Sequence, residues 1–366
     1  MMIFLINLPP PLHGMSYINS KLLQRAKDKG LDINIVNTTP SDKSKISLVS
    51  KVLKHGFIFF DFFKVLIKHS GNNKLYRPIN GGKGQLIDIA YLVLSKLFKY
   101  DVYIHHHSYN YLNIKSKLFS IICFILSGKA KHIVLSADMK EKLSELYNID
   151  SKDIMVLSNI GFIDVDNSQN YKENILKENI VISYMANVTL EKGIDIFIKT
   201  CQMIDNSNPN KYEFRIAGPI IDSNTRKLVD AFTSEFKNAY YVGPVYGEQK
   251  EEFLNASDIF YFPSKYKNEA EPLVLYEAAS CGCLVIGSQV GSMRDAIAHI
   301  SGESFPLTIH SDEEAIDNFV RDVCNFICAL DNNELYIRKR KSKQKFSDNR
   351  FANMDKIDNL LDCLKN

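Results

Sequence analysis

The chain has 366 residues, of which 45% are hydrophobic and 24% are charged, and its net charge at pH 7 is only +3. This balance is that of a globular protein, and it excludes a disordered chain, a collagen-like repeat and a small disulfide-rich scaffold. The length exceeds what one ordinary hydrophobic core organises, so we expect two domains.

The first half alternates strand-like apolar runs with helix-like amphipathic stretches. A strand at residues 1–8 leads through a proline- and glycine-containing loop into a helix over 16–30, and a second strand follows at 31–38. Lysine-rich amphipathic stretches come next, and then two short strands at 101–107 and 132–136. This alternation is typical of α/β proteins with parallel sheets.

A second α/β series follows a polar stretch at 164–178, which has no apolar periodicity and is the expected linker. The series opens with a strand at 179–186 and a helix over 191–204. Four short buried strands are expected after them, at 213–218, 239–245, 258–264 and 283–288. Residues from about 334 onward predict a charged helical tail that becomes amphipathic at its end.

Charge is divided unevenly along the chain. Residues 1–168 carry 22 Lys and Arg against 13 Asp and Glu, whereas the remainder carries 23 against 29, which predicts that the two halves face different partners. The stretches 43–69 and 113–132 are lysine-rich and amphipathic, and the first has six lysines and one acid, Asp61. Such stretches are typical of contacts with an anionic membrane surface, the alternative being core helices with outward lysines. A nucleic-acid partner is not expected, because arginines are few and no binding module is present.

The cysteines are odd in number and mostly stand among apolar residues: Cys123, Cys201, Cys281, Cys283, Cys324, Cys328 and Cys363. Buried, reduced thiols are expected from these surroundings, and with them a reducing compartment. No second ligand pair at zinc spacing accompanies them, so we expect no metal site. The N-terminus lacks a basic n-region, and the longest apolar run, 118–126, is far below the roughly 20 residues that span a bilayer. These features predict a cytoplasmic protein.

The segment 268–282, NEAEPLVLYEAASCG, predicts an anion site. Pro272 suits the start of a helix that ends at Gly282, and the N–H groups near its start, together with the helix dipole, favour a bound diphosphate. Glu269 and Glu277 flank this site, and repulsion from phosphate places them better on the hydroxyl groups of a sugar and a ribose. The alternative is a solvated Glu269 and a Glu277 that only interacts with the helix dipole.

The spacing Glu269-x7-Glu277, preceded by Pro-Ser and followed by EAASCG, resembles the signature of retaining glycosyltransferases of family 4, the glycosyl transferases group 1. Proteins of this family have the GT-B fold, in which two Rossmann-like α/β domains with parallel sheets face each other across a cleft. The resemblance covers roughly residues 1–345 and is more specific in the second half. Further segments that carry it are 9–23, 134–148, 156–162, 185–198, 213–219, 240–264 and 285–297.

The resemblance implies transfer of a sugar from a nucleotide-sugar donor, with retention of anomeric configuration and without a metal or other cofactor. It implies a glycan or polyprenyl-linked acceptor, and a role in the synthesis of bacterial surface polysaccharides such as O-antigen, capsule or exopolysaccharide. Glu277 would bond the donor ribose, catalytic Glu269 the transferred sugar, and catalytic Lys192 the leaving diphosphate. The other donor-binding residues that it implies are Gly14, Asn187, Gly218, Val242, Pro272, Leu273 and Val274.

A run of three histidines closes the predicted strand at 101–107. By the resemblance, His106 is the catalytic histidine, which faces the donor sugar, shapes the reacting face and donates a hydrogen bond. His105 or His107 takes this place if the register shifts by one residue. Successive side chains of a strand alternate in direction, so the three histidines cannot chelate one ion. The alternative is three packed or solvated imidazoles.

Two positions depart from the family pattern. Asn187 stands where the family often has an arginine that contacts the phosphates, so one of two cationic contacts is missing or replaced. Ala270-Glu271-Pro272 stands in place of the common Gly-Phe-Gly, and we expect Glu271 to face solvent rather than the donor sugar. Lys192 has an alternative as an exposed lysine of a first helical turn, which the positive end of the helix dipole disfavours.

The resemblance also divides the chain into three parts. Residues 1–165 would form an N-terminal acceptor-binding Rossmann-like domain, 166–340 a C-terminal nucleotide-sugar-binding Rossmann-like domain, and 341–366 a C-terminal helix that packs back on the first domain. With 43–69 and 113–132 on a membrane surface, the expected location is the cytoplasm, peripherally on the inner face of the cytoplasmic membrane.

The sequence gives less support to other functional classes. A nicotinamide dehydrogenase would need a G-x-G-x-x-G loop after the first strand, which residues 7–15 do not supply. Nothing beyond a count of carboxylates indicates a glycosidase. The two alternatives left by the sequence are a sugar-nucleotide epimerase of the same fold and a non-catalytic nucleotide-sugar-binding protein.

Overall fold

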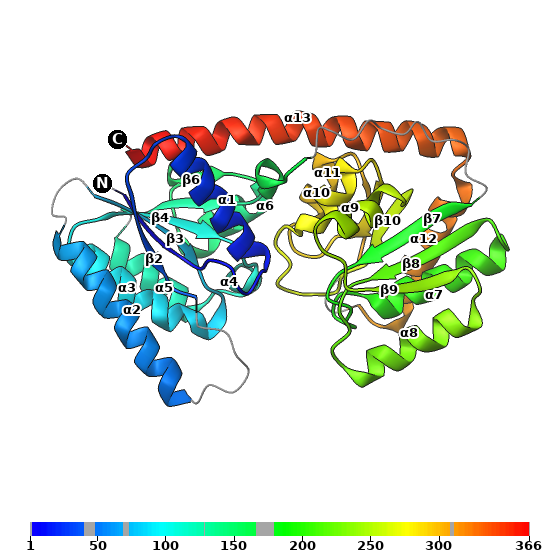
Figure 1. The fold of residues 1–366 in the computed structure, drawn as a ribbon, viewed down its shortest axis with the longest axis horizontal. Coiled ribbons are helices and arrows are strands. Elements are labelled where there is room, and N and C mark those ends of the chain that lie inside the picture. Colours follow the sequence, from blue (N-terminus) through cyan, green and yellow to red (C-terminus); the bar gives the residue numbers. More distant parts are fainter. Residues whose placement is uncertain are drawn as a thin grey trace. The chain divides into compact units, whose positions relative to one another are not determined.

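A computed structural model of the protein describes residues 2–39, 48–68, 73–127, 129–165, 179–307 and 311–365 (Figure 1). Of the predicted linker 164–178, residues 166–178 lie outside the described residues. The lysine-rich stretch 43–69 lies outside them at 43–47 and at 69. In the stretch 113–132, residue 128 is likewise not described.

The chain folds into two compact units. The first unit holds residues 1–162 and 352–366, and the second holds residues 163–351. The chain therefore passes between the units after Phe162 and again after Phe351. The second crossing lies inside one continuous helix, α13 (Asn332–Lys365), so the segment predicted as a separate C-terminal helix is the end of a longer one.

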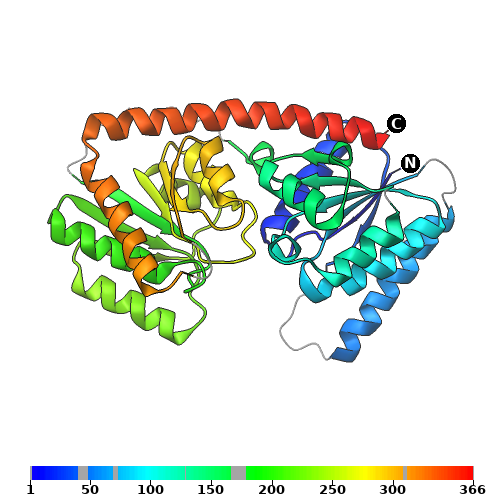
Figure 2. The same ribbon diagram turned by 180° about the vertical axis from the view of Figure 1, so that it is seen from behind.

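The first unit contains a six-stranded parallel sheet in the order β2-β1-β3-β4-β5-β6. Its strands are β1 (Met2–Ile6), β2 (Ile33–Asn37), β3 (Lys74–Ile79), β4 (Asp101–His106), β5 (Lys131–Val134) and β6 (Ile154–Val156). Its helices besides the end of α13 are α1 (Gly14–Asp28), α2 (Leu48–Lys68), α3 (Gln85–Leu97), α4 (Asn110–Asn113), α5 (Lys117–Leu126) and α6 (Ala137–Tyr147). Within this unit, α2, α3 and α5 lie together on the side of the sheet away from the end of α13, as both views show (Figures 1 and 2).

The second unit contains another six-stranded parallel sheet, in the order β12-β11-β10-β7-β8-β9. Its strands are β7 (Ile180–Met185), β8 (Tyr212–Ala217), β9 (Ala239–Gly243), β10 (Ile259–Phe262), β11 (Leu284–Ser288) and β12 (Glu303–Phe305). Its helices besides the start of α13 are α7 (Ile194–Ser207), α8 (Ser223–Glu235), α9 (Glu248–Asn255), α10 (Leu273–Ser280), α11 (Met293–His299) and α12 (Glu313–Ala329). Each unit thus has the Rossmann-like α/β architecture that the alternation of elements predicted.

The apolar runs of the sequence become the central strands. Every residue of β1 and every residue of β7 is buried, as expected for parallel strands that are covered by helices on both faces. Helices are needed to complete that cover, and α1 supplies Ile18, Leu22 and Ala26 at helical spacing. The core of each unit therefore lies between its sheet and the apolar stripes of its helices.

Ion pairs join the C-terminal end of α1 to the end of α13 in the first unit. Arg25 forms a two-pronged pair with Asp358, from Nε to Oδ1 at 2.7 Å and from Nη2 to Oδ2 at 2.8 Å. This guanidinium lowers the pKa of the Asp358 carboxyl. Lys29 pairs with Asp362 at 2.8 Å one turn further along α13. The helix that crosses between the units is thereby attached to the first unit by matched charges as well as by buried leucines.

Strands β3, β6 and β12 were not predicted from the sequence. The sequence of β3, KLYRPI, contains an arginine and a proline, which are unfavourable in a central strand. Arg77 is buried and its Nε donates to Asp88 Oδ1 of α3 at 3.1 Å, while its Nη1 donates to the carbonyl oxygen of Leu5 at 3.0 Å. Pro78 pairs with β4 but lies beyond the last residue pair that β3 makes with β1. A paired charge and a proline at the end of a ladder are compatible with a central strand.

All seven cysteines are free thiols, and Cys201, Cys283 and Cys324 are buried as their apolar surroundings predicted. Cys123, Cys281 and Cys328 are half-buried, and Cys363 is exposed. Burial raises the pKa of the Cys123 thiol to about 12. Among the described residues, no helix combines the length and the apolar character that crossing a membrane requires.

The buried Arg77–Asp88 pair predicts a large effect on stability. We expect Asp88→Ala to lower the free energy of unfolding of the first unit by about 3–5 kcal/mol, because the guanidinium of Arg77 stays buried without its counter-charge. Asp61→Ala removes the other acid of the same helical layer, from an exposed pair with Lys64, and we expect it to leave stability nearly unchanged. Urea denaturation of both variants measures the difference; equal midpoints would contradict the role given to the buried pair.

Candidate active site

The predicted donor-binding residues of the second unit gather at the carboxyl edge of its sheet. Because all strands of this sheet are parallel, the loops after β7, β8, β10 and β11 leave from the same edge. In open α/β sheets, ligands bind in the crevice outside this edge. The loops after β7 and β10 carry the charged side chains of the candidate site.

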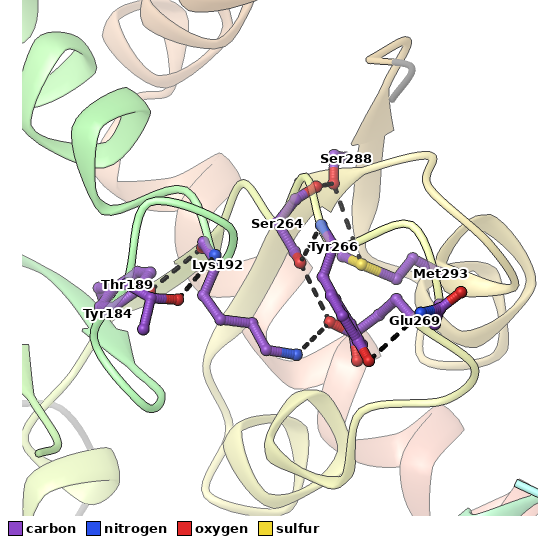
Figure 3. A network of polar contacts seen from close by, with 9 residues as sticks. Tyr184, Thr189, Lys192, Ser264, Tyr266, Glu269, Ser288 and Met293 are labelled. Atoms are coloured by element: carbon purple, nitrogen blue, oxygen red, sulfur yellow. Dashed lines mark hydrogen bonds and ion pairs between the residues drawn. The ribbon is translucent and has the colours of Figure 1, made fainter. Parts of the chain in front are cut away.

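Lys192 and Glu269 form the centre of this site. Lys192 Nζ lies 2.6 Å from Glu269 Oε2, and the hydroxyl of Ser264 donates to the same oxygen at 3.0 Å (Figure 3). The Lys192 ammonium also lies 4.6 Å from the centre of the Tyr266 ring, a cation–π distance. Two donors on Oε2 fix the carboxylate and leave Oε1 as the oxygen that can accept from hydroxyl groups of a ligand.

The position of Lys192 is set by backbone contacts of its loop. Its N–H donates to the hydroxyl of Thr189 at 3.3 Å, and its carbonyl accepts from the hydroxyl of Tyr184 at 3.1 Å. Gly193, which caps α7, has φ +80°, and a Cβ at this residue would stand 1.9 Å from the carbonyl oxygen of Pro263. Only glycine permits this approach, so the loop after β7 rests directly on the backbone that leaves β10.

The backbone of Glu269 is held from the other side by the loop after β11. Gly291 has φ +59°, and a Cβ there would stand 1.8 Å from the carbonyl oxygen of Glu269. The hydroxyl of Ser288, at the end of β11, donates to the carbonyl oxygen of Ser264 at 2.6 Å. Glu269 therefore sits between two loops that touch its own loop backbone to backbone.

Helix α10 begins after Pro272 and spans the residues that the sequence predicted. Pro272 has φ −63° and ψ 124° and contributes no capping side chain, and Leu273 and Val274 form the first helical positions. Their N–H groups have no carbonyl partner inside the helix and are the donors that an anion can use. Glu277, in the middle of α10, accepts from Lys250 of α9, whose Nζ lies 2.6 Å from Oε1.

Lys250 and Tyr266 are functional candidates that the sequence reading missed. Lys250 stands among acidic residues of α9, where an isolated lysine is an ordinary solvent-facing residue; only the packing of α9 against α10 brings it to Glu277. Tyr266 lies in a lysine-flanked loop with no periodic pattern. Its nearness to the motif residue Glu269 is the one signal that pointed to it.

The expectation that Glu271 faces solvent is wrong. Only 5% of Glu271 is exposed, and its Oε1 accepts a hydrogen bond from the hydroxyl of Tyr276. Because Tyr276 is itself fully buried in α10, this contact turns the carboxylate inward. A buried carboxylate needs such a partner, which a reading of the loop sequence alone did not identify.

The remaining donor-binding predictions of this unit lie along the neighbouring strands. Gly218 follows β8 with φ +121°, and a Cβ there would stand 1.7 Å from the carbonyl oxygen of Ala186. Val242 lies near the end of β9 with about half of its surface exposed, and Asn187 is exposed just after β7. Close packing against Ala186 is therefore enough to explain a glycine at position 218. Val242 and Asn187 are exposed and can contact a ligand.

Gly14 and the histidine run belong to the first unit. Gly14 is the exposed first residue of α1, and open space surrounds the place of its missing Cβ. His106 is fully buried, with Nδ1 2.8 Å from the Tyr111 hydroxyl and Nε2 3.0 Å from Nδ1 of His132. Both of its ring nitrogens are therefore used inside the unit.

His105 and His107 lie on the same side of the strand, with ring centres 4.0 Å apart, as the alternation of strand side chains predicted. His105 Nδ1 lies 2.6 Å from the hydroxyl of Tyr76. Nε2 of His107 is buried and has no hydrogen-bond partner among the described residues. Burial, with a smaller effect of the nearby His13, lowers the pKa of His107 to about 3, so its imidazole is neutral at physiological pH.

Within the part of the chain that the structure describes, no three side chains of His, Cys, Asp or Glu are arranged to hold an ion.

Comparison with known proteins finds a family model that matches part of the second unit and several solved structures of similar fold. Residues 166–323 match the family model of glycosyl transferases group 1. A phosphatidylinositol N-acetylglucosaminyltransferase GPI3 subunit of Saccharomyces cerevisiae is 23% identical over 228 residues, which cover 60% of this chain and 48% of that protein. The chain thus spans about half the length of the curated relative that it matches.

Solved structures share the fold over the whole chain. An Anabaena protein, Alr3699/HepE, solved in complex with UDP, is 12% identical with a TM-score of 0.69, over 99% of this chain and 100% of that one. WaaG, a glycosyltransferase involved in lipopolysaccharide biosynthesis, is 12% identical with a TM-score of 0.66, over 99% of both chains. At this identity the likeness establishes the fold, two Rossmann-like α/β domains of the GT-B type.

The close approach at Gly291 predicts the effect of one methyl group. We expect Gly291→Ala to destabilise the second unit well beyond the roughly 1–2 kcal/mol of a left-handed alanine, because the added Cβ meets the Glu269 carbonyl oxygen. Gly30→Ala is the matched control, since Gly30 has φ +67° and open space around its Cβ position. Thermal denaturation compares the two; an equal loss would show that strain alone, and not the contact with Glu269, explains the glycine.

The buried imidazoles predict a loss of stability in mild acid. Burial lowers the pKa of His132 to about 4, below the roughly 6.5 of an unfolded histidine, so the unfolded chain binds more protons between these values. The contribution of His132 is complete above pH 6.5 and is lost as pH falls towards 4, by up to about 3 kcal/mol. We expect His132→Gln to flatten this decline in urea denaturation series across that range; parallel curves for variant and wild type would contradict it.

Proposed function

We propose that the protein is a retaining glycosyltransferase that uses a nucleotide-sugar donor and no bound metal, because residues 166–323 match the family model of glycosyl transferases group 1 and the chain has a GT-B fold. The observation that carries the proposal is the pairing of Lys192 with Glu269 in the loops beside α10, whose first N–H groups and Glu277 complete the set. A cation, a helix N-terminus and two carboxylates are the groups that a diphosphate joined to a sugar and a ribose requires.

Each group has a separate task in the proposed reaction. The diphosphate binds the N–H groups of Leu273 and Val274, Glu277 accepts from the ribose hydroxyls, and Glu269 accepts from hydroxyls of the transferred sugar. Gly218 and Val242 border the nucleoside end. UDP and UDP-glucose bound to the Anabaena protein of the same fold support a nucleotide-sugar as the donor class.

Lys192 supplies the main electrostatic stabilisation in this proposal. When the bond between the anomeric carbon and the diphosphate oxygen breaks, its electron pair stays on that oxygen, where negative charge grows. The ammonium has three N–H donors and uses one on Glu269, so the others can bind the leaving diphosphate. A fixed charge of this kind commonly contributes several kcal/mol to the transition state.

Retention requires the acceptor oxygen to bond to the same face of the anomeric carbon from which the diphosphate leaves. Of the three histidines at the end of β4, we favour His107 as the one that faces this region. Nε2 of His105 and Nε2 of His107 are both buried and without a partner among the described residues, but His105 is fully buried whereas His107 is partly exposed. Both ring nitrogens of His106, the residue that the resemblance favoured, are bonded to Tyr111 and His132. A neutral imidazole acts there as a hydrogen-bonding and shaping group.

The acceptor in this proposal is a glycan or a polyprenyl-linked glycan, and the pathway is the synthesis of a bacterial surface polysaccharide. Support comes from the names of similar proteins, one a subunit of a phosphatidylinositol N-acetylglucosaminyltransferase and one a glycosyltransferase involved in lipopolysaccharide biosynthesis. The excess of lysine in the first half suits an anionic or lipid-linked acceptor. The proposed place of action is the cytoplasm at the inner face of the membrane.

Substitution of Lys192 and of Glu277 tests the function. With the donor first identified by thermal shift in a panel of UDP-, GDP-, ADP- and dTDP-sugars, we expect Lys192→Ala and Glu277→Ala to lower kcat by about a hundredfold or more, because each removes a contact to the donor. Lys199→Ala is the matched control, since Lys199 lies in the adjacent helix α7 in an exposed pair with Asp317. Near-wild-type turnover of either site variant would overturn the assignment.

Three further readouts separate the alternatives. NMR of the product checks retention of anomeric configuration, and activity in excess chelator checks that no divalent metal is needed. An epimerase would convert the donor without any acceptor, and a non-catalytic protein would bind the donor without turnover; either result would replace the proposed transfer.

A further inference from the structure

The outer surface of α2, α3 and α5 carries large apolar side chains that face solvent. We call the outward side chains of these three helices, with the turn before α5, the three-helix face. Its exposed apolar residues are Phe57, Phe60, Ile67, Leu86, Ile87, Val93, Leu97, Ile114, Ile121 and Phe124. They make up half of the large apolar residues that are exposed in the described chain.

The spacing on α3 shows that this exposure is a continuous stripe. Leu86, Val93 and Leu97 lie at i, i+7 and i+11, a spacing that places them on one side of a helix, and Leu97 is 70% exposed. The opposite side of α3 buries Tyr91 and Leu92 against the unit. A surface helix normally turns polar residues outward, so an apolar stripe on both sides indicates a second buried environment.

The neighbouring helices repeat the pattern. On α5, Ile121 and Phe124 face outward, and Phe124 is 82% exposed, the highest value among these residues. On α2, Phe57 is 71% exposed and Phe60 is 54% exposed. Single exposed apolar residues are ordinary, whereas apolar stripes on three adjacent helices form a patch.

The three helices are joined into one layer, so their stripes lie next to each other. Phe62 of α2 packs edge-on against Tyr91 of α3, with ring centres 5.4 Å apart. Lys96 Nζ of α3 donates to the hydroxyl of Ser127, at the end of α5, at 2.8 Å. Both views place the three helices together on one side of the first unit (Figures 1 and 2).

Exposed lysines surround this apolar surface, and acids are nearly absent from it. Residues 56–68, 82–100 and 113–129 contain two acids, Asp61 and Asp88, and Asp88 is buried in its pair with Arg77. The exposed lysines of these segments are Lys64, Lys68, Lys83, Lys96, Lys99, Lys115, Lys117 and Lys129. The surface is therefore apolar along the middle of its helices and cationic towards the helix ends.

We propose that the three-helix face docks on an anionic lipid bilayer. Apolar side chains on a helical surface enter the boundary between headgroups and acyl chains, and the lysines bind the phosphates. A second copy of the chain fits less well, because a two-fold interface would set this face against itself and bring its lysines together. The proposal deepens the membrane side of the proposed function, and none of its residues is among the proposed donor-binding residues.

The lysine-rich sequences of α2 and α5 had predicted a contact with a membrane surface, and the structure shows that α3 belongs to the same face. Helix α3 has one internal lysine, Lys96, and was not part of either lysine-rich stretch. Its outward stripe joins α2 to α5 and turns two separate segments into one surface. The proposed docking therefore depends on α3 as well as on the described outward residues of α2 and α5.

Vesicle sedimentation of the full chain tests this docking. We expect the protein to pellet with phosphatidylcholine vesicles that contain phosphatidylglycerol, to stay in solution with phosphatidylcholine alone, and to be released by high salt. The double variant Leu97→Ser and Phe124→Ser should lower binding at least about tenfold, because two exposed apolar side chains no longer enter the bilayer. Ile337→Ser with Phe351→Ser, on exposed residues of α13, is the matched control and should bind like wild type.

Two measurements keep this result separate from the proposed transfer. Thermal shift by the donor is recorded for every variant, and it should be the same in all of them because none of the substituted residues is a proposed donor-binding residue. Light scattering gives the mass with and without the double substitution. Wild type that stays in solution with anionic vesicles, an equal loss in the control variant, or a dimer that the double substitution dissociates would each overturn the proposal.

Discussion

Backbone contacts that leave no room for a side chain hold the candidate site together. Gly193 lies against Pro263, Gly218 against Ala186 and Gly291 against Glu269, and in each case a Cβ would stand less than 2 Å from a carbonyl oxygen. A carbonyl cannot rotate aside as a side chain can, so each loop fixes the position of the next. Lys192 and Glu269 therefore extend from loops whose backbones are in direct contact through Gly193 and Gly291, which positions the two side chains before a ligand binds.

The charged side chains of the site are paired before any ligand is bound. Lys192 pairs with Glu269, Lys250 with Glu277, and Lys265 with Asp195 of α7 at 2.7 Å. These pairs are partly exposed, so their net contribution to stability is small. Their effect is on geometry, since a carboxylate already held on one oxygen offers the other in a fixed direction. Asn187 stands where the family often has an arginine, so one cation is absent from that position. Lys250 adds a cation to the site, but it pairs with Glu277, which lies at the ribose end of the proposed donor.

Sequence patterns predicted the elements of both sheets where one physical signal dominated. Helix α10 begins and ends at the predicted residues because proline, glycine and the apolar run agree. Strand β3 was missed because Arg77 and Pro78 are unfavourable for a strand unless Asp88, eleven residues later, is brought beside the arginine. Glu271 and Lys250 were missed for the same reason: each is defined by a partner on another turn or another helix, and the local sequence does not encode that partner. The motif predicted which residues gather at the sheet edge. The packing of the loops and helices determines which oxygen or nitrogen atom of each residue forms a hydrogen bond.

The exposure of side chains decides how the lysine-rich stretches of the first half are interpreted. A lysine-rich amphipathic sequence is compatible with a core helix and with a membrane-surface helix, because both have one apolar side. What distinguishes them is a second apolar side, and α3 has one although its charge is unremarkable. Buried aromatic contacts between α2 and α3 account for the inner side of the layer, and no described residue covers the outer side at Leu97 or Phe124. Lysines alone would bind any polyanion; lysines around an apolar surface select one that also offers a hydrocarbon interior, and a bilayer does so.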